Sequence, residues 1–236
     1  MDDLKISIII PLYNEENTII KLLKKICSLK RIKLEIIIIN DGSTDKSLNL
    51  ITQFKKKNKM KIISHKKNCG KGAAIKSAKK YLTGEIVIIQ DADLEYDPKD
   101  YYKLIKPIKE KKTKVVYGSR VLGKYRYNTN EFISLHRIFF NHLLTIISNF
   151  LNNQSLTDAH TCYKAFDAKL FKAIKLKENK FAFCPEITTK ISNLNENILE
   201  VPISYKGRSY KEGKKISFID GIEAIFALIK YKFLDL

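Results

Sequence analysis

The 236-residue sequence contains little cysteine, with widely spaced thiols and no CxxC pair, at Cys27, Cys69, Cys162 and Cys184. A structural zinc site or a disulfide framework needs closely paired or regularly spaced cysteines, so this spacing suggests neither. We expect the four thiols to be packing residues. The histidines suggest no ligand set either; they stand at positions 65, 136, 142 and 160.

The sequence also lacks a signal peptide, a long apolar run and two common nucleotide-binding motifs. Met1-Asp2-Asp3 is acidic and a strand-like segment follows at once, while no run approaches 18 apolar residues. These absences predict a cytoplasmic protein without a transmembrane helix. Neither GxGxxG nor GxxxxGK followed by Ser or Thr occurs, so neither a dinucleotide-binding nor a P-loop protein is supported.

Arginine is scarce in a strongly basic chain. The 44 basic and 25 acidic residues give a net charge of +19, yet the arginines are only Arg31, Arg120, Arg126, Arg137 and Arg208. Such an excess of lysine attracts nucleic acid, anionic lipid or phosphorylated substrates. Nucleic-acid binding is disfavoured because the sequence contains no recognition motif and no arginine–aromatic stripe. Each arginine instead indicates a need for a planar, bidentate donor.

What is present is an alternation of apolar strands and helical patterns, which is typical of βαβ units. Continuous aliphatic runs predict buried parallel strands at residues 6–12, 34–39, 61–64, 86–89 and 114–118. We therefore predict an α/β fold with a Rossmann-like, mainly parallel sheet flanked by helices. One domain should span residues 1–236.

The alternation ends after Gly118. Residues 119–131 predict a polar loop, and residues 132–151 and 216–236 form two strongly apolar helical segments. These C-terminal amphipathic helices could pack on the core. They could also lie on a membrane surface, because basic residues flank them.

One apolar strand stops on two aspartates one residue apart, Asp91 and Asp93. Ligands of open α/β sheets bind beyond the carboxyl ends of the strands. Carboxylate oxygens are hard ligands suited to Mg²⁺ or Mn²⁺, and such a cation is useful where it also holds a nucleotide diphosphate. A solvated acidic turn explains this pair of aspartates equally well. The residues at the ends of the other strands are therefore needed to choose between a metal site and a turn.

Three more polar segments are expected at the same edge, Pro11-Leu-Tyr-Asn-Glu15, Asp41-Gly-Ser-Thr-Asp45 and Gly70-Lys-Gly72. Tyr13 can pack against a base, and Glu15 and Asp41 can accept hydrogen bonds from base or ribose. Lys71 can neutralise phosphate at a helix N-terminus. Two structural alternatives stay open: Glu15 as a first-turn helix carboxylate and Asp41 as a turn former.

In order and spacing, Pro11 to Glu16, Asn40 to Asp45 and Asp91-Ala92-Asp93 resemble the family 2 glycosyltransferases of GT-A fold. The second half is similar to the polyprenyl-phosphate branch, which includes dolichol-phosphate mannose and glucose synthases and their undecaprenyl-phosphate counterparts. The resemblance runs from about Lys5 to Lys232. Its second-half motifs are Gly118-Ser-Arg120, Arg137 with Asn141, Thr157-Asp158, Thr161-Cys-Tyr-Lys164, Glu186, Glu200 to Ser204, Tyr205 to Arg208 and Gly213 to Ile216.

The resemblance implies transfer of a monosaccharide from a GDP- or UDP-sugar to a polyprenyl phosphate, with inversion at the anomeric carbon. Asp91 and Asp93 would hold Mg²⁺ or Mn²⁺, with Glu95 as a further metal or water ligand. Pro11 and Ala92 lie within the matched nucleotide-sugar motifs. Residues 1–118 would form the nucleotide-sugar-binding half, and residues 119–236 the acceptor-binding half with membrane-surface helices.

The resemblance also assigns roles in the second half. Arg120 and Arg137, with Asn141, would grip the acceptor phosphate. Arg208 would close over the diphosphate, together with Lys214 or Lys215.

Asp158 would lie near the reacting centre, where it either orients groups or acts as a base. Lys164 is open to a structural or a catalytic role. His160 departs from the acidic residue expected at its position, which argues against a base there.

The nature of the acceptor separates two interpretations. A phosphate is already anionic at pH 7, so a polyprenyl-phosphate enzyme needs no obligatory base. The alternative is a soluble family 2 enzyme that extends a cell-surface glycan through a sugar hydroxyl, with Asp158 as its candidate base. The favoured interpretation places a peripheral enzyme on the cytoplasmic face of a membrane. Its two apolar helices, its lysines or a membrane-anchoring subunit would bind it there.

Overall fold

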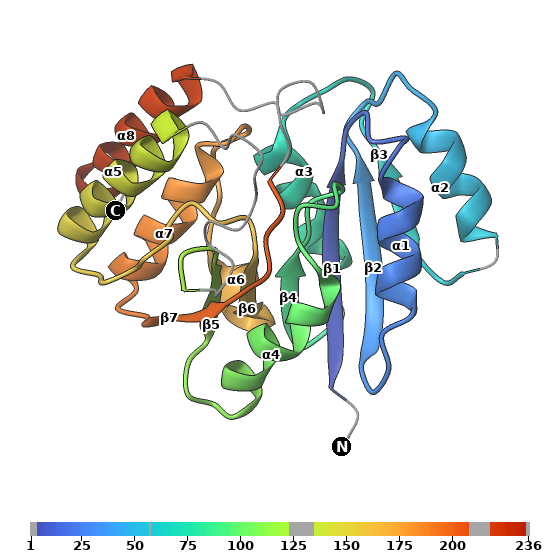
Figure 1. The fold of residues 1–236 in the computed structure, drawn as a ribbon, viewed down its shortest axis with the longest axis horizontal. Helices are drawn as coiled ribbons and strands as arrows, with labels where there is room; N and C mark the ends of the chain where they lie inside the picture. Colours follow the sequence, from blue (N-terminus) through green and yellow to red (C-terminus); the bar gives the residue numbers. More distant parts are fainter. Residues whose placement is uncertain (1–3, 57, 123–134, 208–217, 235–236) are drawn as a thin grey trace.

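A computed structural model describes residues 4–56, 58–122, 135–207 and 218–234, and its centre is a seven-stranded sheet (Figure 1). The strand order is β3-β2-β1-β4-β6-β5-β7. β6 is antiparallel to both of its neighbours, and every other pair is parallel. The strands are β1 (Lys5–Leu12), β2 (Lys33–Asn40), β3 (Lys61–Ser64), β4 (Ile86–Ile89), β5 (Val115–Ser119), β6 (Lys164–Asp167) and β7 (Ile198–Pro202).

Helices cover both faces of the sheet. α1, α2 and α4 supply side chains to the core on one face, and α3, α6 and α7 supply the core on the other. α5 and α8 lie side by side beyond α7, at the left of Figure 1. The helices are α1 (Ile19–Cys27), α2 (Ser47–Lys55), α3 (Lys71–Ala78), α4 (Tyr101–Lys109), α5 (Leu135–Asn152), α6 (Ala168–Ala173), α7 (Phe183–Asn193) and α8 (Phe218–Phe233).

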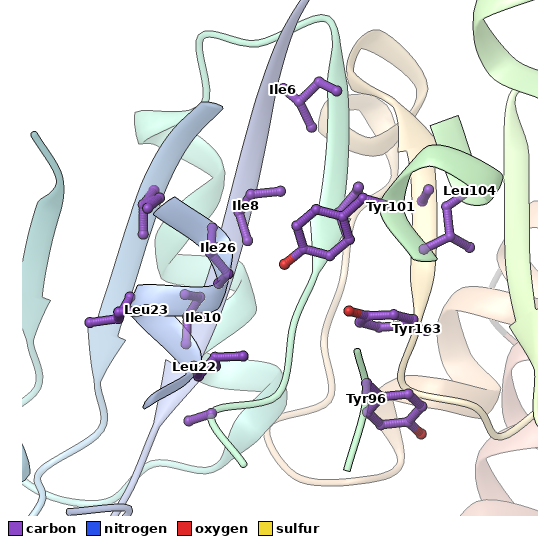
Figure 2. Close-up of a cluster of buried hydrophobic side chains, with 14 of the residues drawn as sticks. Ile6, Ile8, Ile10, Leu22, Leu23, Ile26, Tyr96, Tyr101, Leu104 and Tyr163 are labelled. Atoms are coloured by element: carbon purple, nitrogen blue, oxygen red, sulfur yellow. The ribbon is translucent and has the colours of Figure 1, made fainter. Parts of the chain in front are cut away.

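The two cores follow from the two-residue period of the strands. In β1, Ile8 and Ile10 pack on the α1 side (Figure 2), while Ile9 packs on the α3 side, and all three are fully buried. A parallel sheet covered on both faces needs such continuous aliphatic strands. The sheet therefore provides a rigid frame whose carboxyl edge can hold functional loops in fixed positions.

The predicted α/β fold with a mainly parallel sheet is confirmed, and each of the five predicted strands is present with its bounds within a residue or so. The second half differs from expectation, because β6 and β7 complete the sheet after the regular alternation ends. Both strands are short and contain charged residues, Lys164 and Asp167 in β6 and Glu200 in β7. β6 contains no aliphatic run, and Glu200 interrupts the aliphatic residues of β7, so neither strand shows the continuous aliphatic run of β1, β2 and β4.

α5 and α8 carry exposed apolar stripes. The exposed residues repeat every three or four positions along each helix, which places them on one side of it. No helix among the residues that the structure describes is long and apolar enough to cross a membrane. We name the exposed residues Phe140, Leu143, Ile146, Phe150, Ile222, Phe226, Ile229 and Phe233 the α5–α8 apolar face.

Candidate active site

Most of the predicted site residues that the structure describes lie at one edge of the sheet. Asp41 follows β2, Asp91 and Asp93 follow β4, and Arg120 follows β5. β6 runs in the opposite direction, so its first residue and the loop before it, which carries Asp158, reach the same edge. The fold thus brings together residues from both halves of the sequence.

The paired aspartates lie beside a buried lysine. The Lys71 Nζ forms an ion pair with Asp91 Oδ1, and both side chains are largely buried. Burial alone would lower the pKa of Lys71, but the Asp91 carboxylate outweighs it and raises that pKa well above its ordinary value. Asp93 is buried and accepts a hydrogen bond from the backbone N–H of Glu95 at 3.1 Å. The strand end therefore presents two carboxylates and one fixed ammonium group.

Gln90, which sequence analysis did not single out, fixes the position of this strand end. Its Oε1 accepts hydrogen bonds from the buried hydroxyls of Tyr101 and Tyr163, at 2.7 and 2.6 Å. The two tyrosines are labelled in Figure 2. Its Nε2 donates to the Asp91 carbonyl at 2.9 Å. A polar residue at the end of an otherwise aliphatic strand was the signal in the sequence. Gln90 therefore ties the metal-site candidate to α4 and β6.

We expect the Gln90→Leu variant to lose about 3 kcal/mol of unfolding free energy, because two buried tyrosine hydroxyls would lose their acceptor at roughly 1–3 kcal/mol each. Urea unfolding followed by circular dichroism measures this loss. The matched control is Tyr102→Phe, which removes a hydroxyl that donates to the Lys30 carbonyl at the surface. A Gln90→Leu protein as stable as the control would contradict the role given to Gln90.

Asp41 lies at the centre of a second hydrogen-bonded group. Its Oδ1 contacts His65 Nδ1 at 2.6 Å and accepts the backbone N–H of Cys69 at 2.9 Å, and its Oδ2 accepts that of Gly70 at 2.7 Å. Gly70 has a φ of +98°, and a Cβ there would collide with the Asn179 carbonyl. Asp41 thus organises the loops after β2 and β3, a role that a turn former alone would not fill.

The loop after β1 is held against the loop after β2. The Asn14 carboxamide accepts the backbone N–H of Thr44 at 2.8 Å, and the Glu15 N–H donates to Ser47 Oγ at 2.9 Å. The buried Glu15 carboxylate accepts the Thr18 hydroxyl at 2.7 Å. Tyr13, half-buried, lies in the same loop, and Pro11 lies inside β1 paired with Ile39.

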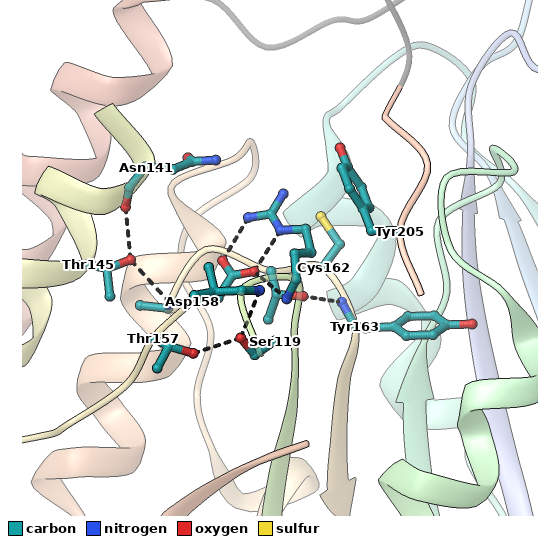
Figure 3. A network of polar contacts seen from close by, with 12 residues as sticks. Ser119, Asn141, Thr145, Thr157, Asp158, Cys162, Tyr163 and Tyr205 are labelled. Carbon is teal, nitrogen blue, oxygen red and sulfur yellow. Dashed lines mark hydrogen bonds and ion pairs between the residues drawn. The ribbon is translucent and has the colours of Figure 1, made fainter. Parts of the chain in front are cut away.

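Arg120, which follows β5, and Asp158, in the loop before β6, form a bidentate ion pair at the same edge of the sheet. Arg120 Nε donates to Asp158 Oδ2 at 2.6 Å and its Nη2 donates to Oδ1 at 2.7 Å, in the network around Asp158 in Figure 3. The Arg120 backbone N–H also donates to Oδ2. Burial alone would raise the pKa of Asp158, but the guanidinium outweighs it and lowers that pKa below its ordinary value. Asp158 is thus a charged, weakly basic carboxylate.

Glu200 of β7 accepts hydrogen bonds from the segment that carries Asp158. Its carboxylate accepts the backbone N–H groups of Thr157 and Asp158, at 2.7 and 2.9 Å, and the Thr157 hydroxyl at 2.8 Å. Ser119 Oγ contacts that hydroxyl at 2.7 Å (Figure 3). The sequence marked Glu200 as part of a motif, but its contacts with Thr157 and Asp158 join segments 42–43 residues apart, which no local pattern predicts.

Tyr205 contacts both Glu95 and Arg120. Its hydroxyl donates to Glu95 Oε2 at 2.9 Å, and the Arg120 guanidinium lies over its ring at 5.2 Å from the centroid. The Glu95 carbonyl also accepts the backbone N–H of Lys206 at 2.8 Å. Glu95, predicted as a further metal or water ligand, therefore holds the segment after β7 in place.

Lys164 and the cysteines have definite surroundings. Lys164 is fully buried, its Nζ donates to the Ala159 carbonyl at 3.0 Å, and burial lowers its pKa to about 8. This contact holds the loop next to Asp158. Cys162 and Cys184 pack as expected. Cys27 and Cys69 are exposed, so the expectation of packing is wrong for these two.

The other predicted acceptor and diphosphate residues belong to α5 or lie outside the described residues. Asn141 is half-buried on α5, and its carbonyl accepts the Thr145 hydroxyl, which in turn accepts the Ala159 N–H beside Asp158 (Figure 3). Arg137 belongs to the first turn of α5, but its side chain is outside the described residues. Also outside the described residues are Arg208, Lys214 and Lys215.

Comparison with known proteins matches this chain to a protein family. The family model of glycosyl transferase family 2 matches residues 7–175. An uncharacterized protein of Methanocaldococcus jannaschii is 28% identical over 96% of this chain and 99% of its own length. The undecaprenyl-phosphate 4-deoxy-4-formamido-L-arabinose transferase of Photorhabdus laumondii is 24% identical over 95% of this chain and 67% of its own length.

A solved structure shares the fold. Glucosyl-3-phosphoglycerate synthase from Mycobacterium tuberculosis, in complex with Mn²⁺, UDP and phosphoglyceric acid, superposes with a TM-score of 0.71. The match covers 98% of this chain and 79% of that chain, at 18% identity. The α/β architecture is therefore that of the GT-A glycosyltransferases. Together with the family match over most of its length, this places the chain in glycosyl transferase family 2, as a glycosyltransferase.

Proposed function

We propose that this protein transfers a monosaccharide, with inversion, from a GDP- or UDP-sugar to a polyprenyl phosphate. The observation that carries the proposal is the Arg120–Asp158 ion pair. A sugar-hydroxyl acceptor needs a base to remove its proton, and a carboxylate with a lowered pKa in a bidentate ion pair is a poor base. An anionic phosphate needs no base. It needs a fixed cationic donor, which Arg120 supplies.

The guanidinium retains donors for a phosphate. Arginine has five N–H bonds, and in this pair the Nε and one Nη2 hydrogen serve Asp158. Asp158 therefore orients Arg120 and leaves the remaining N–H groups for the acceptor. Asn141 and Arg137 are proposed to contribute from α5, which the Thr145 hydroxyl links to the Asp158 loop.

We further propose that Asp91 and Asp93 hold a divalent cation, Mg²⁺ or Mn²⁺. The donor set fits, because both residues offer hard carboxylate oxygens on the rigid end of a buried strand. When bound, such a cation supplies Lewis-acid neutralisation of the departing nucleotide diphosphate. Lys71 places a positive charge at the same point. Glu95 accepts the Tyr205 hydroxyl with Oε2, and its second carboxylate oxygen could contact the cation.

The donor nucleotide is proposed to occupy the loops after β1 and β2. Tyr13 would pack against the base, and Glu15 and Asp41 would accept hydrogen bonds from base or ribose. Pro11 lies in β1, just before the first of these loops. Ala92 lies between Asp91 and Asp93. Arg208 and Lys214 are proposed to close over the diphosphate. The names of the Photorhabdus relative and of the solved UDP complex support the two substrate classes.

A lipid acceptor requires contact with a membrane, and the α5–α8 apolar face suits a peripheral position on the cytoplasmic side. Phe150 is 87% exposed and Phe226 is 69% exposed, and Lys230 and Lys232 lie in the last turn of α8. Apolar side chains flanked by lysines bind anionic lipid surfaces. A separate membrane-anchoring subunit would be a second route to the same position.

We expect the double variant Phe150→Ser with Phe226→Ser to bind anionic phospholipid vesicles at least ~10-fold more weakly, because each phenylalanine contributes roughly 1 kcal/mol or more on transfer from water. Vesicle sedimentation measures the binding. The control is Leu48→Ser on α2, at the opposite side of the molecule (Figure 1). Equal binding by all three proteins would show that this face does not contact lipid.

The reaction itself is tested by a radiolabel transfer assay. The protein is incubated with Mg²⁺ or Mn²⁺, a panel of GDP- and UDP-sugars, and short polyprenyl phosphates. Label in an organic-extractable, acid-labile product supports the proposal and identifies the donor. Nucleotide release into solution without labelled lipid would refute the lipid acceptor and favour extension of a cell-surface glycan.

A further inference from the structure

The fold brings together an oxygen, a nitrogen and a sulfur ligand atom at the end of β2. Asp41 follows β2, His65 follows β3, and Cys69 lies just before α3. One carboxylate oxygen, one imidazole nitrogen and the thiol sulfur of these residues all lie within 4.8 Å of one another. The sequence could not show this group, because its members come from three separate segments.

The chemistry of this group differs from that of Asp91 and Asp93. Zn²⁺ binds His nitrogen and carboxylate oxygen at about 2.0–2.2 Å and thiolate sulfur at about 2.3 Å, often with three protein ligands and one open position. Mg²⁺ prefers oxygen ligands alone. Mixed nitrogen, oxygen and sulfur donors therefore select a zinc-class ion over the cation proposed for the two aspartates.

The supporting contacts already orient two of the three ligands. His65 Nε2 lies 2.8 Å from Ser77 Oγ, so the hydroxyl can fix the imidazole with Nδ1 facing Asp41. The N–H groups of Cys69 and Gly70 hold the Asp41 carboxylate from the other side. His65 Nδ1 and Asp41 Oδ1 are 2.6 Å apart in a hydrogen bond, and a metal ion would replace the shared proton.

Cys69 provides access to the site. Asp41 is buried, but Cys69 is exposed, and its Sγ contacts only the Lys67 carbonyl among its hydrogen-bond partners in the described structure, at 3.3 Å. A thiol at the surface can capture an ion from solution and rotate toward the two fixed ligands. Loss of the thiol proton on binding is expected for a zinc ligand.

We propose that Asp41, His65 and Cys69 form a binding site for a zinc-class divalent cation, and that this ion and the donor nucleotide exclude each other. The exclusion rests on the proposed function, in which Asp41 accepts hydrogen bonds from base or ribose. A metal ion on Asp41 Oδ1 would occupy one of the two oxygens that the carboxylate can offer the nucleotide, and the other already accepts the Gly70 N–H at 2.7 Å. Zinc would then act as an inhibitor whose site is distinct from the Asp91–Asp93 site.

Cobalt(II) titration tests the site directly. Co²⁺ bound by a thiolate gives a near-ultraviolet charge-transfer absorption, which Co²⁺ at the oxygen ligands of Asp91 and Asp93 cannot give. We expect this band in the wild-type protein, its loss in Cys69→Ser, and its retention in Cys27→Ser, which removes the other exposed thiol. A band that is absent from the wild type, or that persists in Cys69→Ser, would overturn the proposal.

Zinc affinity and nucleotide competition complete the test. In competition with a chromophoric chelator, we expect the zinc dissociation constant to rise at least ~10-fold in Cys69→Ser and in His65→Gln. Adding UDP or GDP, whichever the transfer assay identifies, should weaken zinc binding to the wild type. Zinc bound with unchanged affinity at saturating nucleotide would refute the exclusion and the nucleotide role of Asp41, while the cobalt result alone decides the metal site.

Discussion

Changing both Asp91 and Asp93 to asparagine is expected to reduce sugar transfer at least ~10³-fold, which corresponds to the several kcal/mol that a metal ion contributes to a transition state. Asparagine keeps the shape of the side chain but loses the charge that a divalent cation requires. Transfer is measured with the radiolabel assay at saturating Mg²⁺ or Mn²⁺. Metal binding in the presence of the nucleotide, followed through the electron paramagnetic resonance of Mn²⁺, should fall in parallel.

The matched control for this variant is Asp97→Asn. Asp97 lies in the same loop, and its side chain caps the turn at Pro98 by accepting the Lys99 N–H, which asparagine can also accept. We expect the control to keep its activity. Circular dichroism must show that the double variant is folded, because it removes the charge that pairs with Lys71. Full transfer activity in a folded double variant would refute the metal assignment.

Breaking the Arg120–Asp158 pair is expected to have the second large effect. Arg120→Gln and Asp158→Asn should each lower the unfolding free energy by about 3 kcal/mol, because each leaves a buried charge without its partner. In the double variant the loss should fall short of the sum by about 1–3 kcal/mol, since the second change removes the stranded charge. Urea unfolding measures all three. Lys112→Gln, which breaks the exposed pair with Glu110, should leave the unfolding free energy nearly unchanged.

The pH dependence follows from the lowered pKa of Asp158. Its folded-state pKa lies below the unfolded value, so its stabilisation is present above the unfolded pKa and is lost as pH falls through the folded pKa. Wild-type protein should therefore lose more stability between neutral and acid pH than Asp158→Asn does. Equal losses would show that Asp158 is not held as a charged partner of Arg120.

The same variants separate the two roles for Asp158. An orienting residue should affect binding of the acceptor phosphate, so Asp158→Asn should raise the acceptor KM while donor binding is unchanged. A general base should instead lower kcat. An unchanged acceptor KM with a kcat lost in Asp158→Asn would support the glycan-extending alternative.

The sequence predicted those parts of the structure that depend on local pattern. β1, β2 and β4 are aliphatic on both faces, so their bounds and their burial could be read directly, and the polar residues after them had to reach one edge. β6 and β7 could not be read in this way. They are held by neighbours distant in the chain, and β6 pairs with strands that precede it by scores of residues.

In the candidate site too, some residues could be predicted from the sequence, while their contacts with distant residues could not. Asp91, Asp93 and Asp41 were found because motif residues at strand ends are visible in sequence. Asp158 was found by resemblance, but its pairing with Arg120, 38 residues away, required the folded chain. Gln90 is the opposite case. It stood next to Asp91 in the sequence, and only the two tyrosine hydroxyls that converge on it reveal its role.

The position of β6 has a consequence for how the protein forms. β6 lies between β4 and β5, so Ala165 is paired in register with Ile88 on one side and with Val116 on the other. During synthesis, β4 and β5 are both made well before the strand that separates them. A ribosome-bound chain that has emerged only to Ser119 must leave a gap in its sheet. We expect the nascent chain to become resistant to protease only once residue 167 has left the exit tunnel.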